Sequence, residues 1–177
     1  MTSPILTQAI LKALLHYDPE TGLFTWLPRD VSWFPSLHQC KVWNANYAGK
    51  DAGCINAQGY ISITLLLKAL RAHRLAWLYV YGEWPPCHLD HINHVRTDNR
   101  ICNLRGASHQ INGMNTSMYR RNTSGVTGVS LKDGFWIAQI NINKKRKYLG
   151  RSKDKDEAIA LRKQAEIEHG YHPNHGI

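Results

Sequence analysis

The sequence has no long apolar run, and this absence narrows its class. Its longest apolar stretches, such as residues 61–67, fall well short of the ~20 residues that a membrane-spanning helix needs. Residues 1–4 lack the basic segment of a secretion signal. We therefore expect a cytoplasmic protein that has no membrane partner.

Paired cysteines are also missing. The four cysteines include no C-x-x-C pair, which is the usual mark of a structural zinc site. Reduced thiols are the preferred interpretation, and zinc is not expected. The alternative is a zinc site that collects four scattered cysteines, namely Cys40, Cys54, Cys87 and Cys102.

Acidic residues are scarce, above all between residues 117 and 153. The 177-residue chain carries 22 Lys and Arg against 13 Asp and Glu, a formal net charge of +9. Residues 117–153 contain nine basic side chains and a single acid, Asp133. This balance favours a polyanionic partner, usually nucleic acid. The alternatives are a membrane surface and a basic surface without a special role.

Hydrophobic periodicity predicts a mixture of helices and strands in the first half of the chain. Residues 5–15 have the pattern of an amphipathic helix, and 73–81 suit a second helix. Residues 23–26 and the alternating stretch 60–65 are typical of strands. Residues 28–58 are rich in Pro, Trp, Asn and Gly without a clear period, which predicts loops with short strands.

The carboxy-terminal part has a different organisation. After a linker at 117–126, short strands are expected at 127–132, 135–142 and 145–149, and a helix at 155–169. The turn-forming pairs Asp133-Gly134 and Asn143-Lys144 separate the strands. A frayed end is expected for the tail, although its histidines have the spacing of metal ligands: His169, His172 and His175.

Side-chain alternation predicts which faces of these elements pack together. Asp154 is the expected N-cap of the helix, and Glu157 three residues later completes a capping-box pattern. On the helix, Ala158, Leu161 and Ala165 share the face that should pack on the sheet. The strand residues expected to meet them are Trp136, Ala138, Ile140 and Ile142.

A polar cluster between residues 88 and 112 carries the groups that phosphodiester hydrolysis requires. A histidine can take a proton from an attacking water near neutral pH. Asp and Asn oxygens suit a hard cation such as Mg²⁺, which offsets charge on the transition state and on the leaving oxygen. The groups are Asp90-His91, Asp98-Asn99-Arg100, Asn103-Leu104-Arg105 and Asn112.

The geometry of a strand limits how this cluster can work. Successive strand residues point to opposite faces, so Asp90 and His91 serve one site only if the strand bends or ends there. The alternative is that Asp90-His91 is a turn or an ordinary surface pair, with Asn103 and Asn112 as caps or loop formers. His94 and His109 are expected to be bystanders, although a predicted helix places His109 one turn before Asn112.

In its order and spacing the cluster resembles the HNH nucleases, above all their phage and intron-homing members. In these, Asp-His starts the motif and Asn replaces the last His. The resemblance implies a ββα-metal core with one Mg²⁺ or Mn²⁺ ion per active site. It implies that His91 is the general base, that Asp90 and Asn112 hold the metal, and that Asn103 stabilises the loop and orients His91. Asn99 matches a structural position of the family.

The resemblance extends upstream and covers most of residues 17–116. The segment at 18–26, the glycine-containing region around residues 49–59 and the segment at 73–77 recur in phage HNH proteins in this order. Residues 125–169 resemble a second family, the plant ethylene-response-factor (Apetala) type of DNA-binding domain. The matching stretches are 124–130, 135–140, 146–150 and Glu157-Ala158.

In the plant family a three-stranded antiparallel sheet, backed by a helix, lies in the major groove. The arginine run of the first plant strand is missing here, so base specificity is expected to differ. The alternative is a solvated basic hairpin. By resemblance, the DNA-facing residues are Ser130, Lys132, Gln139, Asn141, Arg146 and Tyr148, with phosphate contacts from Lys144, Lys145, Lys147 and Arg151.

The sequence as a whole predicts an α+β protein. Residues 1–86 form a mixed region that supports the nuclease, 87–116 the ββα-metal HNH core, 117–126 a linker and 127–177 the sheet-plus-helix DNA-binding domain. We expect a monomeric, metal-dependent endonuclease that nicks double-stranded DNA and needs no protein partner. The alternatives are a DNA-binding regulator with an inactive nuclease core, a zinc-stabilised structural protein and a nuclease that acts on RNA.

Overall fold

Helices and strands alternate along the chain, which confirms the expectation of a mixed α and β protein. The computed structural model describes residues 5–86, 88–108, 114–143 and 145–177. Of the residues with expected roles, Asn112 and Lys144 lie outside these ranges, as do His109 and Cys87. Internal contacts divide the chain into two units, Met1–Gly106 and Ala107–Ile177. No helix in the described ranges is both long and apolar enough to cross a bilayer.

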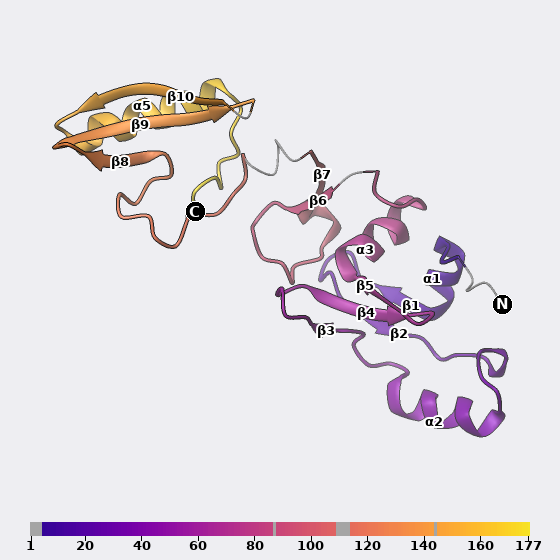
Figure 1. The fold of residues 1–177 in the computed structure, drawn as a ribbon. Helices are drawn as coiled ribbons and strands as arrows, with labels where there is room; N and C mark the ends of the chain where they lie inside the picture. The colour runs from indigo at the N-terminus through magenta and orange to yellow at the C-terminus, as the bar shows by residue number, and fades with distance from the viewer. Residues whose placement is uncertain (1–4, 87, 109–113, 144) are drawn as a thin grey trace. The chain divides into compact units, whose positions relative to one another are not determined.

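The part of the chain up to Ala107 holds three small sheets and most of the helices (Figure 1). Strands β1 and β2 pair antiparallel, β3, β4 and β5 form a second antiparallel sheet, and β6 pairs with β7. The elements are α1 (Gln8–Leu14), β1 (Leu15–Tyr17), β2 (Phe24–Trp26), the 3-10 helix η1 (Val31–Trp33), α2 (Leu37–Tyr47), β3 (Cys54–Ile55), β4 (Ile61–Leu65), β5 (Lys68–Arg71), α3 (Ala72–Tyr81), β6 (His88–His91), the 3-10 helix η2 (Ile101–Asn103) and β7 (Leu104–Ala107).

A single apolar core holds the first unit together. It lies where α1 and α3 pack against each other and against the strands between them. Burial of each large aliphatic side chain stabilises the fold by roughly 2 kcal/mol. Among the least exposed, each at 2 % or below, are Leu11, Leu14, Ile63, Leu65 and Leu75.

Helix α1 begins three residues later than the sequence predicts. Thr7 is extended, and its hydroxyl accepts a hydrogen bond from the backbone N–H of Ile10 at 3.3 Å, which caps the helix. Leu15, predicted to be the last helical residue, instead begins β1 and pairs with Trp26. Strand β1 is not predicted, because its three residues are too few for alternation to be recognised.

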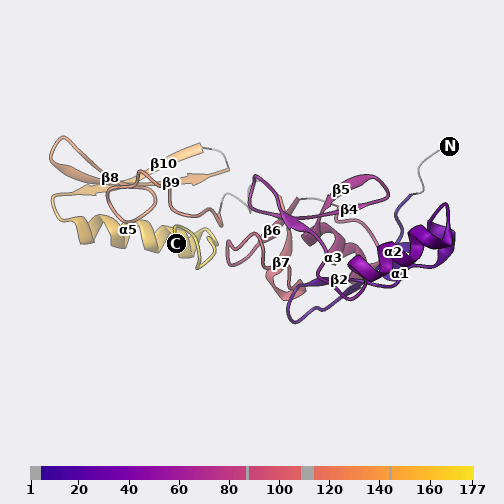
Figure 2. The ribbon, with the colours of Figure 1, turned by 90° about the horizontal axis from the view of Figure 1, so that it is seen from below.

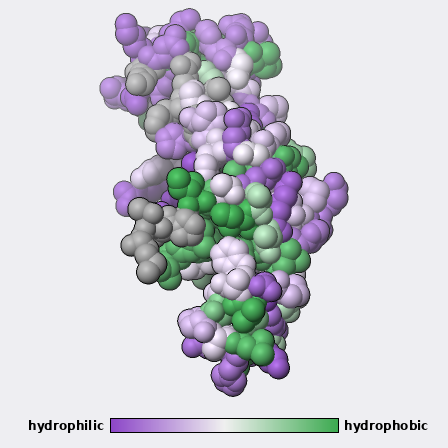
Figure 3. Space-filling model, turned by 90° about the vertical axis from the view of Figure 1, so that its right-hand side faces the viewer, coloured by the Kyte–Doolittle hydropathy of each residue, from purple (hydrophilic) through white to green (hydrophobic). Residues whose placement is uncertain are grey.

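Helix α2 replaces part of the region where the sequence predicts loops with short strands, and that prediction is wrong there. The helix buries only Cys40, so its apolar residues follow no helical period. The missed signal is Ser36, whose hydroxyl accepts a hydrogen bond from the backbone N–H of Gln39. Leu37 and Val42 on this helix stay exposed. Figure 3 shows apolar surface at its foot, where α2 lies.

The second unit is a three-stranded antiparallel sheet with one helix packed on it. The strands are β8 (Val129–Lys132), β9 (Phe135–Ile142) and β10 (Lys145–Ser152), with β9 in the middle. Helix α5 (Lys155–Glu168) covers one face (Figure 2). Ala138, Ile140 and Ala158 are each at most 1 % exposed, so the predicted inner strand face does meet the helix at these positions.

The inner face of α5 differs by one residue from the prediction. Leu161 is 42 % exposed, whereas Arg162 is only 2 % exposed. The buried stripe runs through Ala158, Arg162 and Ala165, which are spaced by four and three residues. A charged residue is tolerated inside because Arg162 has partners: it donates to Glu166 Oε1 at 2.9 Å and to the backbone oxygen of Gln139 at 2.8 Å.

The predicted cap of α5 is present, but the capping box is not. The Asp154 carboxylate accepts a hydrogen bond from the backbone N–H of Asp156 at 2.8 Å. In a capping box, Glu157 would reach back to the backbone N–H of Asp154. Ser152 takes that place, because its hydroxyl accepts from the Asp154 N–H at 2.9 Å and donates to Glu157.

The carboxy-terminal tail packs back on the unit, so the expectation of a frayed end is wrong. His175 is 5 % exposed, and its Nε2 lies 3.1 Å from a guanidinium nitrogen of Arg162. The hydroxyl of Tyr171 donates to the backbone oxygen of Asn141 at 2.6 Å. Backbone hydrogen bonds join His172 to Met114, and further along the tail Gly176 to Thr116. The buried Arg162 supplies the attraction that the tail sequence alone does not reveal.

In the first unit, the turn between β1 and β2 packs tightly against the loop that precedes η2. Gly22, with φ of +74°, forms part of this turn. A Cβ atom on Gly22 would lie 2.4 Å from the backbone nitrogen of Arg100 and 2.6 Å from the carbonyl carbon of Asn99. Gly49 has a similar φ of +78°, but a Cβ atom there would meet nothing within 4 Å. The first glycine is therefore needed for both its conformation and its small size.

We expect Gly22→Ala to lower the free energy of unfolding by about 2–4 kcal/mol, because it adds a backbone clash to the strain of a left-handed alanine. Gly49→Ala carries the same strain without the clash and should cost only about 1 kcal/mol. Urea denaturation of both variants measures the difference. Equal losses in the two variants would contradict the tight packing at Gly22.

Candidate functional site

The predicted polar cluster lies on β6, on η2 and on the loop between them. Strand β6 ends at His91, and a turn follows at once, in which the backbone N–H of His94 donates to the carbonyl of His91 at 3.0 Å. The condition for Asp90 and His91 to serve one site, a strand that ends there, is met. Downstream, the carbonyl of Asn103 accepts from the backbone N–H of Ile92 at 2.9 Å, which ties the two ends of the loop together.

The ring of His91 is buried among aromatic and amide groups. It is 5 % exposed, and its centroid lies 5.0 Å from the ring of His73, edge to face, and 5.9 Å from that of Tyr60. Its Nε2 lies 3.4 Å from Oδ1 of Asn99, a residue that is 1 % exposed. The imidazole is thus in contact with a residue of α3, with the residue before β4 and with the loop after β6.

The side chain of Asn99 determines the tautomer of His91. The Asn99 amide nitrogen donates to the carbonyl of Thr97 at 3.3 Å, so the amide oxygen is the atom that faces the ring. An amide oxygen only accepts, and Nε2 must therefore carry the hydrogen. Nδ1 is then the ring nitrogen with the lone pair, which is the nitrogen that a general base uses.

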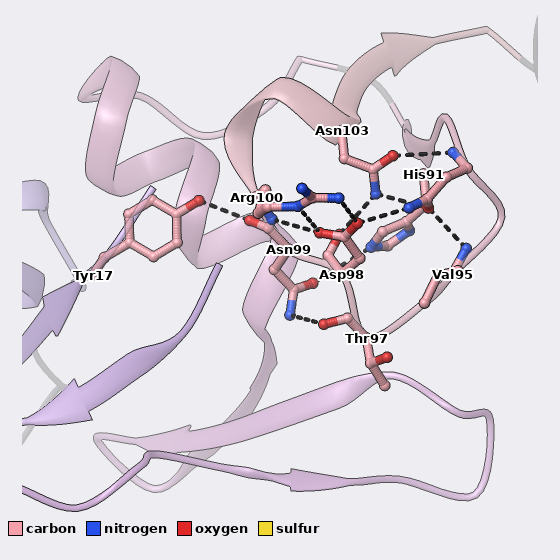
Figure 4. Close-up of polar contacts among 9 residues, drawn as sticks. Tyr17, His91, Val95, Thr97, Asp98, Asn99, Arg100 and Asn103 are labelled. Carbon is pink, nitrogen blue, oxygen red and sulfur yellow. Dashed lines mark hydrogen bonds and ion pairs between the residues drawn. The ribbon is translucent and has the colours of Figure 1, made fainter. Parts of the chain in front are cut away.

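Asn103 stabilises the loop rather than contacting the ring of His91 (Figure 4). Its amide nitrogen donates to Oδ1 of Asn93 and to the backbone oxygen of Asp98, both at 2.9 Å. Its amide oxygen accepts from the backbone N–H of Asn93 at 3.0 Å. Because Asn103 is 6 % exposed, these bonds are shielded from water and hold both sides of the loop.

An ion pair on the outer side of the loop completes this network. The carboxylate of Asp98 accepts from Arg100 Nε at 2.8 Å and Nη2 at 2.6 Å, and from Asn93 Nδ2 at 2.7 Å. The hydrogen bonds from Arg100 are the main reason that the pKa of Asp98 falls to about 2. The carboxylate is therefore charged at neutral pH.

Burial keeps the two histidines of the site neutral. The pKa of His73 is lowered to about 3, first by loss of solvation and then by the nearby His91, Arg71 and Arg74. The pKa of His91 is also lowered, mainly by loss of solvation; the bond to Asn99 and the charge of Asp90 oppose this. At neutral pH, His91 can therefore accept a proton.

Asp90 is held by an arginine from the neighbouring strand. Arg105 donates to Oδ2 of Asp90 from Nε at 3.2 Å and from Nη2 at 3.0 Å. The Asp90 side chain is 17 % exposed. Its carboxylate is the class of oxygen donor that Mg²⁺ prefers. Within the described ranges, no three His, Cys, Asp or Glu side chains gather as a metal cluster. The other expected ligand, Asn112, lies outside them.

Three contacts of this site could not be found by matching motifs. Sequence comparison assigns Asn99 a structural place, whereas in the structure it is the amide that touches His91. Tyr17, at the end of β1, donates its hydroxyl to the backbone oxygen of Asn99 at 2.7 Å in a buried bond. The only sequence signal for a role of Tyr17 is its position directly before the segment at 18–26, which resembles phage HNH proteins. His73 lies in another resembling segment, and nothing in the sequence shows its contact with His91.

The open face of the sheet in the second unit carries most of the expected DNA-facing residues. Residues paired across antiparallel strands share a face. The register pairs Ser130 with Ile137, Tyr148 with Gln139, and Arg146 with Asn141, all on the face away from α5. It pairs Lys147 with the buried Ile140 and Lys145 with Ile142, which places these two lysines on the helix side.

A β-bulge brings Arg151 to the open face as well. Arg146 and Arg151 are five residues apart, so in a regular strand they would point to opposite faces. The register shifts between Tyr148 and Gly150, and Arg151 then pairs with Ile137. Its guanidinium carbon lies 4.8 Å from the ring centroid of Phe135, which is on the same face. The bulge thus collects both arginines on one surface.

Comparison with known proteins adds one finding. Residues 70–114 match the family model of an HNH endonuclease. The matched segment runs from β5 past β7 and includes the loop network around His91. The match supports a nuclease of the HNH type, a class of hydrolase that acts on DNA and generally uses a divalent metal. No curated protein and no solved structure matches the chain.

Proposed function

We propose that the chain is a metal-dependent HNH endonuclease that hydrolyses phosphodiester bonds in double-stranded DNA and nicks one strand at a time. The observation that carries this proposal is the buried, neutral His91, whose tautomer is set by Asn99 within the matched segment. A single site of this kind acts on one strand, so the proposed form is a monomeric nickase of the phage, homing-like type without a protein partner.

His91 is the general base in the proposed mechanism. Nδ1 takes the proton of a water as the water oxygen bonds to phosphorus and the bond to the 3′ oxygen breaks. The imidazolium that forms donates from Nε2 to Asn99 Oδ1, so the amide oxygen stabilises the new charge. Because burial disfavours this charge, the proton is passed on readily after the bond breaks.

Asp90 and Asn112 are the proposed ligands of one Mg²⁺ or Mn²⁺ ion, which would offset the charge on the leaving oxygen and on the transition state. The Asp90 carboxylate fits such an ion chemically, and its pairing with Arg105 fixes the side chain close to His91. Asn103 is a positioning residue that keeps the loop, and with it Asn99, in place.

The second unit is the proposed DNA-binding domain, of the ethylene-response-factor type. Its proposed DNA-facing residues are Ser130, Lys132, Gln139, Asn141, Arg146 and Tyr148. The alignment of the arginines and amides on one open face supports this role, because a sheet fits the major groove and Gln and Asn can pair with adenine. The same proposal includes the domain boundaries: a supporting region at 1–86, the ββα-metal core at 87–116, a linker at 117–126 and the DNA-binding domain at 127–177. Lys144, Lys145, Lys147 and Arg151 remain the proposed phosphate contacts.

The first test is cleavage of supercoiled plasmid by the full chain with Mg²⁺, with EDTA, and with the variant His91→Ala. We expect open-circle product only with metal and with His91, and a loss of at least about 100-fold in the variant, because general-base catalysis supplies that much. His38→Ala, which removes an exposed imidazole on α2, is the control and should nick like the wild type.

Two results would contradict the proposal. Equal nicking by His91→Ala would remove the assigned base. Tight binding of duplex DNA by the wild type, without cleavage in Mg²⁺ or Mn²⁺, would favour a DNA-binding regulator with an inactive core.

The sheet surface is tested by two neighbouring residues that the register places on opposite faces. Arg146→Ala should weaken binding to duplex DNA by roughly tenfold, because it removes a charge-assisted hydrogen bond. Lys147→Ala removes the same charge from the helix side and should weaken binding less. Fluorescence anisotropy in EDTA measures both. A larger loss for Lys147→Ala would place the DNA on the other face.

A further inference from the structure

Two arginines that contact Tyr60, a ring neighbour of His91, have no carboxylate partner. Arg71, at the end of β5, and Arg96, in the loop after β6, are both exposed. The ion pairs of the described part of the chain use Arg100, Arg105, Arg162 and Lys163, and neither Arg71 nor Arg96 takes part in one. Two positive charges are therefore brought together with no internal anion to balance them.

Neutral groups hold these two arginines in place. The guanidinium carbon of Arg71 lies 4.7 Å from the ring centroid of Tyr60, and that of Arg96 lies 5.1 Å from it. Gln58 accepts from both: its side-chain oxygen bonds to Arg71 Nη2 and its backbone oxygen to Arg96 Nη1, each at 2.7 Å. Each arginine thus uses one end for support and keeps further N–H groups for a ligand.

The pair has the geometry of an anion site that is formed before its ligand binds. A guanidinium stacked on a ring has its face covered and its N–H edge directed outward, which suits a phosphate. Fixing the side chains in advance lowers the entropy that binding has to remove. The Tyr60 ring lies 5.9 Å from the ring of His91, so Tyr60 contacts both the two arginines and the proposed base.

We propose that Arg71 and Arg96 form a phosphate clamp that grips the backbone of the DNA strand next to the bond that is cut. This inference rests on the proposed nuclease function and adds to it a substrate-positioning site in the first unit. The clamp contacts the phosphodiester backbone and reads no base, so it holds any sequence that the second unit delivers. Its role is to press the strand toward His91, where the attacking water is activated.

The test measures binding of the full chain to duplex DNA in EDTA at several salt concentrations. Arg71→Gln and Arg96→Gln remove the charge but keep a stem that can pack on Tyr60. Each should weaken binding by about tenfold and reduce the slope of log K against log salt by about one, as expected for one lost phosphate contact. The double variant should lower the slope by about two.

Arg74→Gln is the matched control. Arg74 follows in α3, and its guanidinium carbon lies 5.8 Å from the ring of Trp84, so the substitution removes a stacked arginine that does not touch Tyr60. Its salt dependence should equal that of the wild type. If the double variant behaves like Arg74→Gln, the clamp does not exist.

A second variant avoids any effect on folding from the loss of the arginines. Gln58→Glu keeps both arginines and places a carboxylate against Arg71, which neutralises it and should reduce the salt slope by about one. An unchanged slope in Gln58→Glu, with Arg71 and Arg96 still present, would count against the clamp. Thermal unfolding identifies any variant that is not folded.

Nicking by the same variants separates this inference from the nuclease proposal. If the wild type cuts, the double variant should nick at least about tenfold more slowly even at saturating DNA, because the strand is no longer held against His91. A full rate at saturation would show that the phosphate is not beside the cleaved bond. If the wild type does not cut but the slopes change as expected, the nuclease proposal fails and the phosphate site stands.

Discussion

The hydrogen bond between Asn99 and the ring of His91 is the interaction on which the rest of the site depends. Asn99 is 1 % exposed, its amide oxygen faces Nε2 of His91, and its backbone oxygen accepts from Tyr17. One residue therefore joins Tyr17, a member of the apolar core, to the ring of His91. Asn103 and Gly22 contact the backbone beside Asn99 and so hold this residue in position: Asn103 donates to the carbonyl of Asp98, and Gly22 packs against Asn99 and Arg100.

The acidic and the basic side chains around the site have different kinds of partner. The described carboxylates of the cluster, Asp90 and Asp98, each have an arginine partner, so neither repels an approaching phosphate at full strength. Arg71 and Arg96 are instead supported by neutral groups and keep their charge for a ligand.

The sequence predicts those parts of the structure that depend on local pattern. The strands of the second unit, the Asp154 cap and the grouping of Asp90, His91 and Asn103 follow from alternation, capping preference and motif spacing. Features that depend on distant partners could not be predicted. Arg162 is buried because the tail and Gln139 supply acceptors, and α2 carries almost no apolar period. The contact of Asn99 with His91 depends on the path of the loop between β6 and η2, which no local pattern shows.

The most direct test of the account is the nicking rate of Asn99→Ala at saturating DNA, measured beside DNA binding and thermal unfolding of the same protein. If Asn99 holds the ring and sets its tautomer, the folded variant should bind DNA normally and lose at least about tenfold in rate. A folded Asn99→Ala protein that nicks as fast as the wild type would contradict the account, because His91 would then need no support from Asn99 to act.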